Sequence, residues 1–158
     1  TKGYSISARY SFSKWLSIGG NFSHMNVRDN MRTSQGTAAE SLTYRQRIPN
    51  MPYTFADSDF NFYWHGLGGK GNVLTLTYDN QYTHSFTYYS ANIGSNKGDY
   101  VVPDQFAHNL AISYSIRNGR YNLSFECRNF TDARLYDNFS LQKPGRAFYG
   151  KVRIYFGN

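Results

Sequence analysis

The residues best suited to chemistry are two carboxylates two positions apart and four scattered histidines. Asp57 and Asp59 project from the same side of an extended strand, where such a pair could do acid/base work, hold a cation, or pair with arginine and water. The histidines lack the spacing of a metal site, and a single cysteine excludes an intramolecular disulfide. We therefore expect no catalytic centre, no metal and no other cofactor. The histidines are His24, His65, His84 and His108, and the cysteine is Cys127.

The segment from Gly66 to Gly71 is rich in glycine and superficially similar to a phosphate-binding loop. It lacks the spacing of such a loop, and no helical pattern follows it. We interpret it as a tight turn between two strands.

The composition favours strands with one polar and one apolar side. Aromatic residues make up 18% of the chain, with 15 Tyr and 12 Phe, yet the mean hydropathy is -0.63. No segment approaches the ~20 apolar residues of a membrane-spanning helix, which excludes helical membrane proteins. Tyr, Phe and Thr fit pleated surfaces, and Tyr and Trp sit well at membrane interfaces. The β-barrels of outer membranes have this composition.

The chain is basic, with a net charge of +7 and an isoelectric point near 9.5. Such a charge raises the question of a nucleic-acid partner. The basic residues are scattered, however, and they form neither a contiguous stripe nor a known nucleic-acid-binding motif. We therefore expect no nucleic acid among the partners.

Seven strand patterns follow one another, joined alternately by tight turns and by long polar segments. The pair Asn118-Gly119 favours positive φ and predicts a two-residue hairpin turn. The predicted strands are residues 3–12, 15–27, 53–64, 72–89 and 106–116, one beginning near Tyr121, and one ending at Phe156; the long segments are 28–52, 90–105 and 131–145.

Apolar and polar residues alternate with period two in these strands, as Leu74, Thr75, Leu76 and Thr77 illustrate. The long segments all fall on one side of the meander, as in transmembrane barrels with short inner turns and long outer loops. A soluble up-and-down barrel would also alternate, but it would rarely place three such loops on one rim. The last strand taken alone would equally fit the edge of a soluble sandwich. The aromatic residues near strand ends that suit a membrane girdle are Trp15, Tyr53, Trp64, Tyr88 and Tyr121.

Three stretches, residues 47–62, 118–132 and 135–149, carry a resemblance to a known family. They resemble the C-terminal part of TonB-dependent outer-membrane receptors of the Bacteroidetes type. The alternating end of the chain is similar to the signal that directs barrel assembly, although Gly157 and Asn158 follow the last aromatic residue. The residues that match this signal are Gly150, Val152, Ile154 and Phe156.

The resemblance implies an all-β fold, an antiparallel up-and-down transmembrane β-barrel of about 22 strands around a plug. Residues 1–158 would supply about seven C-terminal strands, while the plug domain and the TonB-binding segment would lie outside this sequence. The strand pattern starts directly at Tyr4, which predicts a fragment or a processed product. The implied location is the bacterial outer membrane. The implied partners are membrane lipid, the rest of the barrel and plug, the TonB complex and the barrel-assembly machinery.

Two functions are compatible with these expectations, and neither is enzymatic. One is energy-coupled import of a large scarce ligand such as an iron chelate, haem, cobalamin or a glycan. The other is a surface adhesin or receptor without active transport, which an upstream plug sequence would argue against. The candidates for the ligand pathway are polar residues of the predicted lumen and loops: Arg9, Tyr44, Arg45, Arg47, Asp57, Asp59, Tyr63, Glu126, Arg128, Tyr136, Arg146, Tyr149, Lys151 and Arg153.

Overall fold

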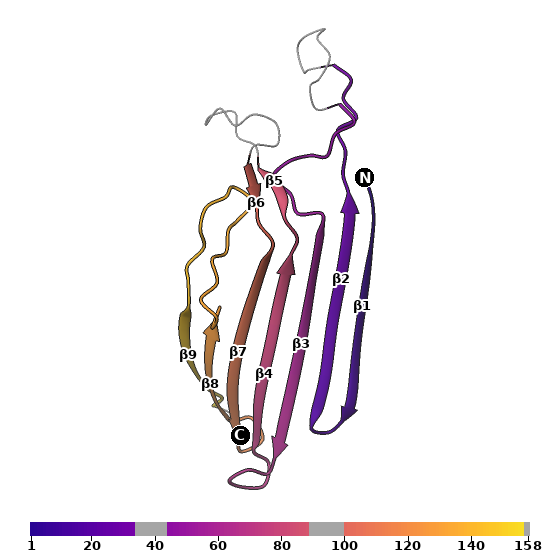
Figure 1. Ribbon diagram of the computed structural model, residues 1–158. Helices are drawn as coiled ribbons and strands as arrows, with labels where there is room; N and C mark the ends of the chain where they lie inside the picture. Colours follow the sequence, from indigo (N-terminus) through magenta and orange to yellow (C-terminus); the bar gives the residue numbers. More distant parts are fainter. Residues whose placement is uncertain (34–43, 89–99, 157–158) are drawn as a thin grey trace.

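The computed structural model describes residues 1–33, 44–88 and 100–156, and the regular elements in these ranges are all β-strands (Figure 1). No helix among them is long and apolar enough to cross a membrane. The strands are β1 (Lys2–Ser13), β2 (Leu16–Asn26), β3 (Thr54–His65), β4 (Val73–Thr83), β5 (Phe86–Tyr88), β6 (Tyr100–Val102), β7 (Gln105–Ile116), β8 (Tyr121–Arg128) and β9 (Ala147–Ile154).

Seven of these strands form one antiparallel sheet in the order β1-β2-β3-β4-β7-β8-β9. The predicted all-β, up-and-down meander of seven strands is confirmed. The described strands form no closed barrel, because β1 and β9 lie at opposite edges of an open sheet (Figure 1). That this sheet is part of a larger transmembrane barrel stays a prediction. Each edge strand has a neighbour on one side only in the described residues, which leaves a row of backbone groups without a ladder partner.

The strand register separates the side chains into two faces of opposite character. Because side chains alternate along each strand, residues paired across the ladder share a face. We define the apolar face as the one that carries Ile6, Phe22, Phe60, Leu76, Ile112, Phe125 and Val152, and the polar face as the one that carries Arg9, Asn21, Asp59, Asp79, Asn109, Glu126 and Lys151.

The prediction of a single long strand over residues 72–89 is wrong in one respect, because the strand breaks at His84 and Ser85. Pairing of β4 with β7 ends at Thr83 opposite Gln105. Beyond the break, β5 pairs with β6 in a separate two-stranded ribbon. Part of the segment predicted as a loop over residues 90–105 is therefore strand, and Tyr89 and residues 90–99 lie outside the described ranges.

A side chain replaces the ladder at this break. Pro103 has no N–H to donate, and the Asp104 carboxylate accepts a 2.6 Å hydrogen bond from the Ser85 backbone N–H. The same carboxylate lies 2.8 Å from His84 Nδ1. These contacts join the ribbon to the sheet at the point where the backbone pairing stops.

Among the described residues, the buried apolar side chains are Tyr53, Phe86, Val102 and Cys127. The Tyr53 hydroxyl lies within hydrogen-bond distance of the carbonyls of Val27 (3.0 Å) and Ile48 (2.6 Å). Burial raises the pKa of this phenol. The place of Tyr53 in an aromatic girdle stays a prediction; in the structure its ring is packed against Arg47.

The tight turns lie together at the end of the sheet opposite the ribbon (Figure 1). Asn118 and Gly119 have φ values of 55° and 90°, as their types predict. The turn is longer than the predicted two residues, because Ile116 and Tyr121 form the last ladder pair and residues 117–120 connect them. Arg117 also has a positive φ of 51°, which the sequence did not indicate.

Candidate functional site

The candidate site is the polar face together with the segment 129–146, which joins β8 to β9. On the β1–β3 side, the Arg9 guanidinium lies 2.8 Å from the Asp59 carboxylate. The Asn61 amide donates to Asp59 at 2.6 Å, and Thr77 Oγ1 donates to Asn61 Oδ1 at 2.8 Å. These residues come from β1, β3 and β4, so one hydrogen-bonded network extends over the four neighbouring strands β1 to β4.

Two further groups of contacts lie on the β4–β9 side of the polar face. Asn109 of β7 donates to Asp79 of β4 at 2.7 Å. In β8, Arg128 Nε donates to Glu126 at 2.6 Å, and the guanidinium lies 4.7 Å from the centre of the Tyr149 ring in β9. Asp79, Glu126 and Arg128 on this face are therefore each paired with a polar, charged or aromatic neighbour.

A cavity of about 690 Å³ lies between the polar face and segment 129–146. Asp79, Asn109 and Glu126 line it from the sheet, while Tyr136 and Lys143 line it from the segment. The walls thus combine carboxylates, amides, hydroxyls, an ammonium group and aromatic rings. Such a mixture suits a large polar ligand, because convergent polar groups and aromatic surface together fix orientation.

Segment 129–146 is attached to the polar face by specific hydrogen bonds. The backbone N–H of Tyr136 donates to Gln105 Oε1 at 2.5 Å. The backbone N–H of Asn129 donates to Asn109 Oδ1 at 2.8 Å, and the Asn129 amide is itself bonded to Ala133. The Asp132 carboxylate accepts from the backbone N–H of Arg146 at 2.9 Å. This segment therefore has a defined position over the polar face.

The predicted ligand-pathway residues separate into three groups in the structure. Those that line the cavity are Glu126, Arg128, Tyr136 and Tyr149; those elsewhere on the polar side of the strands are Arg9, Asp57, Asp59, Tyr63, Lys151 and Arg153; and those in loops outside the cavity are Tyr44, Arg45, Arg47 and Arg146.

The loop group near β2 and β3 serves contacts of its own. The Arg45 carbonyl accepts from the Arg28 guanidinium at 3.1 Å, and Arg47 stacks over Tyr53 at 4.7 Å. Tyr44 forms an isolated backbone bridge with Asp29. The structure therefore does not bring these residues to the cavity.

Sequence reasoning missed several residues of the cavity. Asp79 lies in the polar phase of its strand, as Asp57 and Asp59 do, and the same signal could have found it. Gln105 was missed because residues 90–105 were predicted as a loop, although it begins β7 in the polar phase. Asn138 and Lys143 gave no such signal, because their positions depend on how segment 129–146 folds back.

The described residues include no group of three or more His, Cys, Asp or Glu side chains that could hold a metal ion. Three histidines instead contact tyrosines of the apolar face: His24 contacts Tyr4, His84 contacts Tyr82 and His108 contacts Tyr78. His108 Nδ1 lies 2.8 Å from the Tyr78 hydroxyl, and the two rings are stacked.

The Asp104 carboxyl, which lies between β6 and β7, has a lowered pKa. The hydrogen bond from the Ser85 backbone N–H is the largest cause that lowers the pKa of the Asp104 carboxyl, and His84 adds to it. The ionised carboxylate is therefore the form that joins the ribbon to the sheet.

The chain matches no family model, no curated protein and no solved structure.

Proposed function

We propose that this chain forms part of the wall of a transmembrane β-barrel in the bacterial outer membrane, within a TonB-dependent receptor that imports a large scarce ligand. In this proposal the apolar face contacts lipid and the polar face lines the lumen. The ligand passes the polar face and the cavity beneath segment 129–146. The rest of the barrel would pair with the two edge strands, because lipid cannot hydrogen-bond their backbone groups.

The observation that carries the proposal is an apolar band of the same length at both edges of the sheet. On β1 the band runs from Tyr4 to Phe12, and at the other edge it runs from Phe148 to Phe156, which is nine residues in each case. A transmembrane β-strand needs about 9–11 residues. Large apolar side chains of this band are exposed, including Ile6 at 64% and Val152 at 69%. Exposure of that extent calls for a covering medium.

The band is also slanted relative to the strand register. Through the ladder, Tyr4 aligns with Thr54 of β3, whereas Phe148 aligns with Phe60. The upper limit of the band therefore lies level with residue 54 of β3 at the β1 edge and level with residue 60 of β3 at the β9 edge. Six strand intervals separate these two edges. With about 3.3 Å per residue and about 4.8 Å per interval, the slant is roughly 35°. Strands of membrane barrels tilt by about 35–45°, and a flat bilayer must then meet successive strands at shifted positions.

Deleting β9 from the intact protein tests the import proposal. Without Ala147–Ile154 the barrel loses an edge needed for closure, so surface assembly and ligand uptake should be lost together. The control is Arg32→Gln, which changes an exposed residue outside the strands that is not a candidate for the ligand pathway. Continued uptake by the β9 deletion would refute the proposal, as would isolation of this chain as a stable water-soluble monomer.

A second candidate, a surface adhesin or receptor without transport, is favoured by one observation. Phe139 and Leu141 are each 65% exposed, and the Asp137 carboxylate accepts hydrogen bonds from both of their backbone N–H groups. An ordered loop that displays apolar side chains suits attachment to a partner. The test is the variant Phe139→Ser/Leu141→Ser. Loss of attachment in this variant would favour this candidate, provided that the cells take up no ligand with or without the change.

A further inference from the structure

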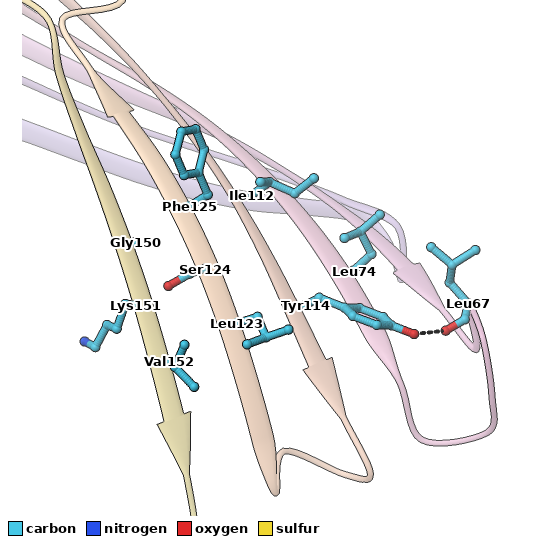
Figure 2. Close-up of a pocket in the computed structure, with 10 residues that line it drawn as sticks. All are labelled: Leu67, Leu74, Ile112, Tyr114, Leu123, Ser124, Phe125, Gly150, Lys151 and Val152. Carbon is cyan, nitrogen blue, oxygen red and sulfur yellow. Dashed lines mark hydrogen bonds between the residues drawn. The ribbon is translucent and has the colours of Figure 1, made fainter.

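Two hollows lie near the tight turns, one on each face of the sheet. A groove of about 400 Å³ on the apolar face is lined by Ile112, Leu123 and Val152 (Figure 2). A hollow of about 600 Å³ on the polar face is lined by Asn122 and Arg153, among others. The two linings take alternate ladder pairs of β8 and β9, so they face opposite sides of the sheet. The groove suits the lipid that the proposed function brings to the apolar face, whereas the hollow on the polar face needs a different occupant.

Three exposed arginines surround the hollow on the polar face, which we call the arginine hollow. Arg117 and Arg120 belong to the turn between β7 and β8, and Arg153 belongs to β9. The Arg117 guanidinium lies 5.9 Å from the centre of the Tyr121 ring, and that of Arg153 lies 6.0 Å from the centre of the Tyr155 ring. Within the described ranges, no carboxylate forms a salt bridge with any of the three arginines. Three guanidinium groups without a counter-charge favour an anionic occupant.

Hydrogen bonds fix the backbone that carries these arginines. The buried Asn72 side chain accepts a 3.0 Å hydrogen bond from the Arg117 backbone N–H. The Tyr155 backbone N–H donates to the Arg120 carbonyl at 2.9 Å, and Arg153 Nη1 donates to the Tyr155 hydroxyl at 3.1 Å. The arginines are therefore held on one framework, so an anion can bind with little ordering of the backbone.

The end of the sheet at the tight turns is cationic. The residues between the paired strands there include no Asp or Glu, and their cations are Lys14, Lys70, Arg117 and Arg120. Along β8, the acidic residue nearest to the arginine hollow is Glu126, which lies four residues from Asn122, or about 13 Å. Glu126 is already paired with Arg128. The charge of this end therefore complements an acidic partner.

Two aromatic side chains favour a peptide over an inorganic anion as that partner. Tyr155 and Phe156 line the arginine hollow and are 54% and 88% exposed. A lone phosphate would leave both rings in water. A peptide can cover the rings with its own apolar side chain while its carboxylates contact the arginines. Arginine and aromatic residues are also the types enriched in protein interfaces.

We propose that the arginine hollow is the docking site of an acidic peptide segment of a partner protein. Carboxylates of the segment pair with Arg117, Arg120 and Arg153, and an apolar side chain of the segment packs against Phe156. The inference rests on the proposed function for its orientation, because that function places the tight turns in the periplasm. The partner is then a periplasmic protein.

The test is fluorescence anisotropy of a labelled Glu-Glu-Phe-Glu-Glu peptide with the intact protein in detergent. The peptide should bind, and salt should weaken its binding. Arg117→Gln/Arg120→Gln should weaken binding by about tenfold, because two surface ion pairs are lost. The matched control, Arg32→Gln/Arg134→Gln, removes the same charge from segments at the other end of the sheet and should leave binding unchanged. A Glu-Glu-Ser-Glu-Glu peptide should bind more weakly, which tests the contact with Phe156 without changing the protein.

Two results would overturn this inference and leave the proposed function standing. One is the absence of peptide binding by protein that still takes up its ligand, and the other is equal binding by the two double variants. Displacement of the peptide by inorganic phosphate, with no preference for phenylalanine over serine in the peptide, would assign the arginine hollow to a soluble anion instead. Peptide binding that depends on Arg117 and Arg120, in a protein without ligand uptake, would support the docking site and count against the proposed function alone.

Discussion

Asp59 of β3 lies directly opposite Asp79 of β4 on the polar face of the sheet. Two like charges in this position destabilise a sheet unless other groups compensate. The compensating donors come from strands on either side, with Arg9 lying 2.8 Å from Asp59 and the Asn109 amide donating to Asp79 at 2.7 Å. The acidic pair is therefore held by residues distant in sequence.

Arg9→Gln should leave the two carboxylates less balanced and lower the free energy of unfolding. The loss should stay below about 1 kcal/mol, because the Arg9 side chain is largely exposed to solvent. Adding Asp79→Asn in the Arg9→Gln background should recover part of it. A double-mutant cycle measured by urea unfolding of the intact protein gives the coupling, and strictly additive effects would show that Arg9 and Asp79 do not share this network.

Charge should be costly on the apolar face and tolerated on the polar face. Ile112→Arg should impair membrane assembly by roughly 2–4 kcal/mol if the position lies near the bilayer midplane. Leu76, its ladder partner, should behave in the same way. The control is Ser113→Arg, one residue along the same strand on the other face. Folding yields into lipid vesicles measure both, and equal tolerance would contradict the assignment of the faces.

The long segments should face the outside of the cell and the tight turns the periplasm. In a Cys127→Ser background, an impermeant maleimide should label Asn138→Cys on intact cells and leave Asn118→Cys unlabelled. Both positions are exposed in the structure, so accessibility alone does not separate them. Permeabilised cells should show labelling of both. The reverse pattern on intact cells would invert the topology and remove the basis for ligand entry from outside.

Acid should loosen the junction between the β5–β6 ribbon and the sheet. The pKa of the Asp104 carboxyl is lowered from 3.8 in the folded chain, so its contribution to stability is present above that pH. As pH falls through the lower folded value, the carboxylate is protonated and the contribution is lost. Hydrogen exchange at the Ser85 amide should accelerate over this range. Asp104→Asn should exchange faster at neutral pH and lose the acid dependence; unchanged protection would show that Asp104 does not hold the junction.

Period-two alternation was enough to predict the seven strands and which residues share a face. Leu74, Leu76 and Ile112 share one face and Thr75 and Thr77 share the other, because strand geometry fixes this parity once the strand is assigned. The break at His84 escaped prediction, since alternation continues through it. Only the Asp104 side chain from a distant position, together with Pro103, shows where the ladder stops.

The candidate site was predictable where it lies on strands and not where it depends on a loop. The parity of Glu126, Arg128 and Tyr149 places them on the polar face. The position of Tyr136 above them depends on the contact of its backbone with Gln105, 31 residues away in sequence. No local pattern encodes such a contact. Local sequence pattern cannot predict closure of the sheet into a barrel either, because closure requires strands that pair with β1 and β9.

The most direct test of the central claim is a spin-label accessibility scan along β4 of the intact protein in lipid bilayers. Single cysteines from residue 74 to residue 77, in a Cys127→Ser background, would carry the label. Labels at Leu74 and Leu76 should be accessible to oxygen and protected from a water-soluble nickel complex, while labels at Thr75 and Thr77 should show the opposite preference. Equal accessibility to the nickel complex at all four positions would contradict the account, because both faces of the sheet would then lie in water.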